Sequence, residues 1–193
     1  NFQNPNGSNP CYIINDEKNV ITANYSSGNI SVLGKNNDGS IGAVKQVVQH
    51  TGKSINTKRQ EAPHAHMVYF SPDKKYVLAN DLGTDKIYVY QYNSNSATEV
   101  LTLKSSIDVK PGSGPRHLIF SKDGKQVYLL QEMDGTITSF NYAKGMLKKV
   151  NETTVVAADF KGDIGAADIH ISPDGKFLYA TNRGTANDIS AFK

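Results

Sequence analysis

The stretch GPRH, residues 114–117, places an arginine and a histidine where an alternating apolar run begins, and Glu132 follows shortly afterwards. Two histidines occur in PHAH, at His64 and His66, and a later arginine is Arg183. A histidine or glutamate can take a proton from water, and an arginine can stabilise a developing oxyanion or bind phosphate and carboxylate. These residue types indicate acid–base chemistry on an anionic substrate, provided that the fold brings them together.

The elements that would position these residues form a repeat with a spacing of about 50 residues. Three aligned segments begin at His66, Arg116 and Ala167, and a weaker copy begins at Cys11. Each reads as a β-run, a Pro-Asp-Gly-Lys-type turn, a second run, a Gly- or Asp-rich turn and a third run, and a fourth run usually follows. Four strands per unit of this length predict β-propeller blades.

The predicted fold is therefore all-β, in one domain that forms part of a propeller. The expected antiparallel blades are four-stranded, and the last lacks its outermost strand; they cover approximately residues 11–57, 62–109, 114–158 and 165–193. The SPDGK-type turns are hairpin chemistry wherever they occur, so they indicate architecture alone.

Alignment of the repeats gives the polar residues equivalent positions. Each repeat has an anchoring serine, at Ser71, Ser121 and Ser172. The residues five positions before the three serines are His66, Arg116 and Ala167. The residues eleven positions after them are Leu82, Glu132 and Arg183. The start of a first strand and the end of its antiparallel neighbour share one sheet edge. His66, Arg116, Glu132 and Arg183 are therefore expected on one rim, at the mouth of the central channel, as the catalytic set.

Other interpretations of the same residues remain open at this stage. Arg116 and Glu132 could form an ordinary surface ion pair. His64 and His66 would share a face and could bind a metal, but no third ligand stands at matching spacing, so no metal is predicted. Asp81 reads mainly as a turn residue that also lies on the rim, and we include it with His64 and His117 as a candidate substrate contact. Strand alternation places His117 on the face opposite Arg116.

Composition narrows the class of protein. The formal net charge is +3, with lysines scattered among acidic residues, so no nucleic-acid or membrane surface is expected. The single cysteine, Cys11, has apolar neighbours and is predicted to be a buried structural thiol. No run is long enough to span a bilayer and the first residues do not resemble a signal peptide, which favours a cytoplasmic protein.

The motifs APHAHMVYFSPDKKYVLANDLGTDKIYVY, GSGPRHLIFSKDGKQVYLLQE and IHISPDGKFLYATNRG resemble the lactonase family of seven-bladed β-propellers, which includes bacterial 6-phosphogluconolactonases and fungal carboxymuconate-lactonising enzymes. The resemblance covers most of the chain from Ala62 onward, and GPRH followed by the glutamate is its specific part. It implies that about four of seven blades are present, and that the site comprises His66 or His64, Arg116, Glu132 and Arg183.

The resemblance implies hydrolysis of a sugar lactone without a cofactor. His66 or Glu132 would be the general base, Arg116 would stabilise the oxyanion and Arg183 would anchor an anion. The resemblance implies a small anionic lactone as the substrate, with 6-phosphogluconolactone as the first candidate. A lactonising enzyme acting on a carboxylated muconate and a non-catalytic scaffold are the alternatives. Unclosed blade edges could associate with another chain.

Overall fold

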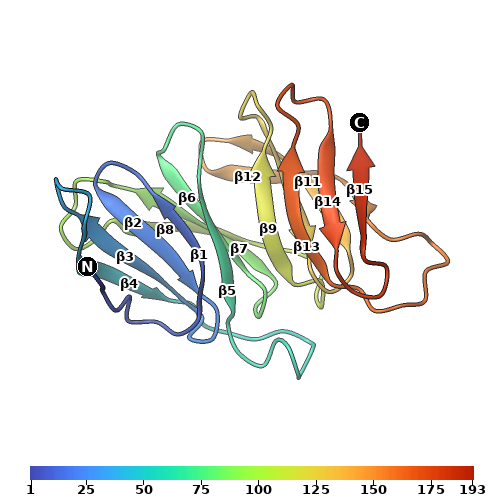
Figure 1. Cartoon of the computed structure of the whole chain (residues 1–193), viewed down its shortest axis with the longest axis horizontal. Helices are drawn as coiled ribbons and strands as arrows, with labels where there is room; N and C mark the ends of the chain where they lie inside the picture. Colours follow the sequence, from blue (N-terminus) through green and yellow to red (C-terminus); the bar gives the residue numbers. More distant parts are fainter.

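The computed structural model describes residues 1–193, and all its regular elements are β-strands (Figure 1). The first sheet contains β1 (Pro10–Asn15), β2 (Asn19–Asn24), β3 (Asn29–Lys35) and β4 (Ile41–Gln49). The second contains β5 (Ala65–Phe70), β6 (Tyr76–Asp81), β7 (Lys86–Tyr92) and β8 (Leu101–Asp108). The third contains β9 (Pro115–Phe120), β10 (Gln126–Gln131), β11 (Thr136–Ala143) and β12 (Met146–Thr154). The last contains only β13 (Ala166–Ile171), β14 (Leu178–Asn182) and β15 (Asp188–Phe192).

Each sheet is an antiparallel meander whose strands are ordered as in the sequence, which is the architecture of propeller blades. The sheets follow one another from blue to red in Figure 1, and the first strands β1, β5, β9 and β13 contact one another in succession. Three apolar clusters fill the spaces between adjacent sheets, centred on residues such as Val77, Leu129 and Ile169. The core is therefore layered between blades, and the first strands form its inner edge.

In the second, third and last sheets, the turns between first and second strands are built from the repeated serine and aspartate. In each, the serine hydroxyl donates to the aspartate two residues later, at 2.6, 2.6 and 2.5 Å for Ser71, Ser121 and Ser172. The same hydroxyl accepts a backbone N–H five residues later, at 2.9–3.0 Å. These turns serve architecture, as the sequence indicates.

Each first strand contains a β-bulge at the same place. In β9, Pro115 pairs with Gln131 and His117 with Leu130, so Arg116 is an extra residue without a partner. The same irregularity falls on Cys11 in β1, on His66 in β5 and on Ala167 with Asp168 in β13. A bulge redirects a side chain out of the regular alternation. The rim positions thus differ from the rest of each strand in backbone conformation.

The position after each second strand is also repeated. The backbone N–H groups at these positions donate to the carbonyl that precedes or begins the first strand, with lengths of 2.8–3.0 Å. The four residues are Tyr25, Leu82, Glu132 and Arg183. They therefore lie beside the bulges, at one end of the sheets, and Tyr25 adds the first blade to the set expected from the sequence.

The outer faces of the first and last sheets leave apolar side chains exposed, among them Ile13 at 61 % and Ile189 at 71 %. The structure contains no helix that is long and apolar enough to cross a membrane.

Candidate active site at the rim

The carboxylate of Glu132 is the centre of the candidate site. Arg116 Nε donates to Glu132 Oε2 at 2.9 Å, and Arg183 Nη2 donates to the same oxygen at 3.2 Å. Arg59 Nη2 donates to the other oxygen, Oε1, at 2.7 Å. His66 Nε2 lies 3.9 Å from Oε2. The structure thus brings His66, Arg116, Glu132 and Arg183 together on one rim and adds Arg59.

Arg59, Arg116 and Arg183 are the only arginines in the chain, and all its other permanently charged basic side chains are lysines. Arginine differs from lysine in its planar fork of donors, which matches the geometry of carboxylate and phosphate. Glu132 and Arg116 are largely buried, with side-chain exposures of 9 % and 14 %, while Arg59 and Arg183 are 45 % and 57 % exposed. The site therefore has a buried ion pair and two cations that face solvent.

Several contacts fix the backbone that carries Arg116. Gly114 adopts φ +68°, and a Cβ there would lie 3.1 Å from side-chain atoms of Leu82 and Met133. The carboxylate of Asp85 accepts from the N–H groups of Gly112 and Gly114, at 2.6 and 2.8 Å. The glycine is needed for the left-handed turn, and Asp85 holds the turn in place. This explains the GSGPR sequence before the strand.

The electrostatics of the site keep Glu132 ionised. Burial alone would raise the pKa of Glu132, but the hydrogen bond from Arg59 and the positive charges of Arg59 and Arg116 outweigh it and lower that pKa. Burial and the neighbouring charge of Arg183 lower the pKa of Arg116, although Glu132 opposes this shift. A carboxylate that accepts from three guanidinium groups is a weak base, so its main effect is to orient the arginines.

His66 is held as a neutral imidazole. Burial, followed by the positive charge of Arg116, lowers its pKa well below the usual histidine range. Nδ1 is buried without a hydrogen-bond partner, while Nε2 faces Glu132. The ring packs edge-on against Tyr25, with centroids 5.6 Å apart. Of the two candidate bases, Glu132 has both oxygens engaged by arginines. The Nε2 atom of His66, by contrast, lies 3.9 Å from Glu132 and is not engaged in a hydrogen bond.

We expect acid to destabilise the protein through His66. In the unfolded chain this residue titrates near pH 6.5, whereas its folded pKa is lower, so the unfolded state binds the extra proton as the pH falls. Between pH 7.5 and 5.5 this one group should cost about 1.4 kcal/mol of unfolding free energy. Urea denaturation at the two pH values should show a loss smaller by that amount in His66→Gln. Equal losses in the two proteins would contradict the assignment.

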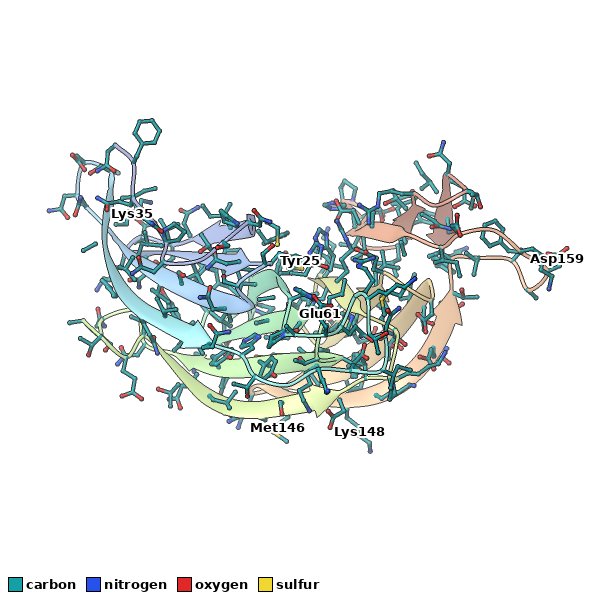
Figure 2. All side chains as sticks on the ribbon, turned by 90° about the horizontal axis from the view of Figure 1, so that it is seen from below. Tyr25, Lys35, Glu61, Met146, Lys148 and Asp159 are labelled. Atoms are coloured by element: carbon teal, nitrogen blue, oxygen red, sulfur yellow. The ribbon has the colours of Figure 1, made fainter.

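His64 and Asp81 lie in a neighbouring network. The ring of His64 stacks on Tyr25 at 4.5 Å between centroids, and its Nε2 lies 3.3 Å from Glu61. Tyr25 and Glu61 are both labelled near the middle of Figure 2. Asp81 is fully buried and accepts from the backbone N–H groups of His64 and Thr84 through Oδ1. The structure places Asp81 beneath the rim and gives its carboxylate protein partners.

His117 does not point away from Arg116 as strand alternation predicts. Arg116 Nη1 lies 3.2 Å from His117 Nε2, and His117 Nδ1 lies 2.8 Å from Asp168. The bulge at Arg116 is the physical reason, because alternation no longer applies across it. His117 therefore touches the guanidinium group of the site. Asp168 orients the His117 ring and also contacts His170.

Arg59 and Tyr25 are the site residues that sequence reasoning missed. Arg59 lies in the long connection between β4 and β5, outside the repeated pattern, and its Nη2 also lies 3.3 Å from the Tyr25 hydroxyl. The scarcity of arginine is the signal that could have identified it. The position equivalent to Glu132 in the weaker first repeat could have identified Tyr25.

Cys11 is exposed, so its prediction as a buried residue was wrong. It occupies the bulge of β1, and its sulfur lies 3.4–3.7 Å from the backbone carbonyls of Ala23, Ala65 and His66. Partial burial nevertheless raises the pKa of the thiol to about 11. The thiolate needed for nucleophilic chemistry is therefore disfavoured.

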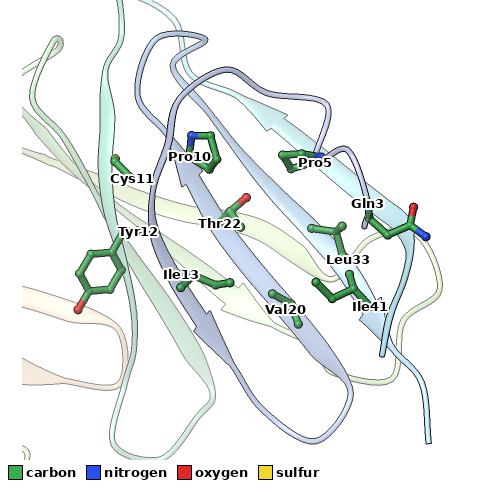
Figure 3. A pocket seen from close by; sticks show the side chains of 10 residues that line it. All are labelled: Gln3, Pro5, Pro10, Cys11, Tyr12, Ile13, Val20, Thr22, Leu33 and Ile41. Atoms are coloured by element: carbon green, nitrogen blue, oxygen red, sulfur yellow. The ribbon is translucent and has the colours of Figure 1, made fainter. Parts of the chain in front are cut away.

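A separate cavity of about 360 Å³ lies on the uncovered side of the first sheet (Figure 3). Its lining is mostly apolar, including Ile13, Val20 and Leu33, and it contains none of the residues around Glu132. No group of three or more His, Cys, Asp or Glu side chains in the structure is arranged to hold a metal ion. The convergent polar chemistry is therefore at the Glu132 rim.

The family model described as "Lactonase, 7-bladed beta-propeller" matches residues 1–193. The chain belongs to this lactonase family. A curated 6-phosphogluconolactonase of Bacillus subtilis is 36 % identical over 188 residues, which are 95 % of this chain and 52 % of the relative. This lactonase-family chain thus spans about half the length of the curated relatives it matches.

Solved structures of similar proteins agree with the blade arrangement. A Bacteroides fragilis protein is 42 % identical with a TM-score of 0.92, and the match covers 98 % of this chain and 54 % of that one. The periplasmic gluconolactonase of Pseudomonas aeruginosa is 38 % identical with a TM-score of 0.89, covering 95 % and 52 %.

Proposed function

We propose that this protein hydrolyses a sugar lactone, with 6-phosphogluconolactone as its substrate. The observation that carries the proposal is the convergence of the chain's three arginines on Glu132, beside a neutral histidine. Cations and a base at one rim are what hydrolysis of an anionic lactone requires. The names of the relatives from Bacillus subtilis and Pseudomonas aeruginosa support the same reaction class.

In the first step, the oxygen of a water molecule attacks the lactone carbonyl carbon while His66 Nε2 takes the proton. The carbonyl oxygen becomes an oxyanion, which accepts hydrogen bonds from Arg116. The Nη2 group of Arg116 has no protein partner, whereas Nε and Nη1 are used by Glu132, Ala167 and His117. Glu132 thus orients the guanidinium group and leaves donors free for the substrate.

In the second step, the oxyanion re-forms the carbonyl and the bond to the ring oxygen breaks. The ring oxygen takes the proton from His66, which restores the neutral imidazole and releases the open-chain acid. The low pKa of His66 belongs to a site without a bound anion. An anionic substrate brings negative charge beside the arginines, which raises that pKa and strengthens the base when the substrate is in place.

The arginines also favour a second enzyme class, because guanidinium groups bind carboxylates as well as phosphates. A lactonising enzyme acting on a carboxylated muconate would use the same contacts. A purely structural propeller fits the geometry less well, since a scaffold has no need for three arginines on one carboxylate at distances of 2.7–3.2 Å.

The proposal is tested by hydrolysis of 6-phosphogluconolactone above its spontaneous background. Acid release is followed with a pH indicator at low buffer concentration, over a series of protein concentrations. A rate proportional to protein concentration supports the proposal. A rate equal to the background at every concentration would reject this substrate, and a carboxylated muconolactone would be assayed next.

A further inference from the structure

Arg59 reaches the site from a connection that is itself held in place. The segment of residues 50–64 joins β4 to β5, and Gln60 within it is fully buried. Gln60 Nε2 donates to the carbonyl of Leu82 at 2.9 Å, and Gln60 Oε1 accepts from the N–H of Asn56 at 3.1 Å. Since Arg59 precedes this anchored residue, its guanidinium group is presented to Glu132 from a fixed backbone.

Arg59 lies on a different side of Glu132 from the other arginines. It contacts Oε1, while Arg116 and Arg183 both contact Oε2. Only Nη2 of Arg59 is used by the protein, for Glu132 and the Tyr25 hydroxyl. Its Nε and Nη1 groups retain their N–H donors on a side chain that is 45 % exposed. The protein does not use these donors, so the side chain can donate further hydrogen bonds to an anion.

The net positive charge of the groups around Glu132 also favours the binding of a further anion. Three guanidinium groups surround one carboxylate, and His66 is neutral, so these groups together carry a surplus of positive charge. One anionic centre in a lactone, the developing oxyanion, is already directed to Arg116. The positive charge of Arg59, next to Glu132 Oε1, is therefore available to a second anionic group on the same ligand.

We propose that Arg59 forms a second anion subsite, which binds a phosphate monoester at the end of the substrate remote from the reacting carbonyl. This rests on the proposed lactone hydrolysis and assigns the selectivity for a phosphorylated over an unphosphorylated lactone to Arg59. In this arrangement Arg116 and Arg183 contact the carbonyl end of the substrate, and Arg59 contacts the phosphate end.

The test compares 6-phosphogluconolactone with unphosphorylated gluconolactone in wild type and Arg59→Ala. The kcat/KM for the phosphorylated lactone should fall about 30-fold more than that for the unphosphorylated one, because a charge-assisted hydrogen bond to phosphate is lost. The ratio is the measured quantity, since any loss through Glu132 affects both substrates. Arg59→Lys, which keeps the positive charge but not the guanidinium donors, should give an intermediate ratio.

Lys58→Ala is the matched control, because it removes the same charge from an adjacent exposed residue, and the only hydrogen bond of Lys58 is donated by its backbone N–H to Asn56 Oδ1. Its ratio should equal that of wild type. An unchanged ratio in Arg59→Ala, or an equal change in Lys58→Ala, would overturn the subsite.

A separate binding measurement keeps this inference distinct from the proposed function. Inorganic phosphate is titrated into wild type, Arg59→Ala and Lys58→Ala by calorimetry. If neither lactone is hydrolysed, the proposed function fails, and phosphate affinity decides the subsite. A Kd about 30-fold higher in Arg59→Ala alone supports it, whereas equal affinities, including absence of binding to wild type, reject it.

Discussion

Arg116→Ala should lower kcat/KM for the lactone by about 1,000-fold while the fold is retained. Arg116 is the least exposed of the three arginines, and its Nη2 donors are directed to no protein group. Loss of one oxyanion donor typically costs 100- to 1,000-fold, and this substitution also removes the cation that pairs with Glu132. The expected loss is therefore at the upper end of that range.

Initial rates at several lactone concentrations separate kcat from KM for this variant. Because the contact forms mainly with the transition state, kcat should carry most of the loss. Arg116→Lys keeps the charge but not the fork, and should recover only part of the activity. Circular dichroism of each variant checks the fold. A folded Arg116→Ala protein with activity within threefold of wild type would remove Arg116 from the catalytic set.

Asp81→Ala should reduce the free energy of unfolding by about 3–5 kcal/mol, because it removes the acceptor of several buried hydrogen-bond donors. Asp81 Oδ2 lies 2.6 Å from His50 Nδ1, and His50 Nε2 lies 2.9 Å from the Tyr90 hydroxyl. All three residues are buried, and His50 follows β4 whereas Asp81 and Tyr90 lie in β6 and β7. The network therefore joins the first blade to the second.

Removal of the Asp81 carboxylate leaves several buried donors without an acceptor, including the backbone N–H groups of His64 and Thr84. Urea denaturation measures the loss. Asp38→Ala is the matched control, because Asp38 is exposed and accepts only from Ser40; it should change stability by less than about 0.5 kcal/mol. A loss below 1 kcal/mol in Asp81→Ala would show that the network is not needed for stability.

The periodicity of the sequence was sufficient to predict the blades. Ser71, Ser121 and Ser172 mark equivalent turns because the same hydroxyl–carboxylate contact is repeated, and such local chemistry can be recognised in a sequence. Counting from these serines also identified equivalent rim positions, including those of Arg116 and Glu132. Antiparallel pairing then predicted that these residues share an edge.

The missed features depend on backbone geometry that periodicity does not encode. The bulge at Arg116 breaks the alternation from which the direction of His117 was inferred. Arg59 belongs to a connection with no counterpart in the repeat, so no alignment of blades could place it. Cys11 was predicted as buried from its apolar neighbours, but the bulge of β1 sets its position instead.

The recurrence of the bulge in every first strand makes the chemistry of the rim modular. His66 and Arg116 occupy two of these positions with reactive or charged side chains, while Cys11 and Ala167 occupy the other two. The strand pairing on either side of each bulge is independent of the side chain that it carries. A point substitution at Cys11 or Ala167 could therefore add a functional group to the same ring of residues without a new loop, and one scaffold could acquire new specificities by such single steps.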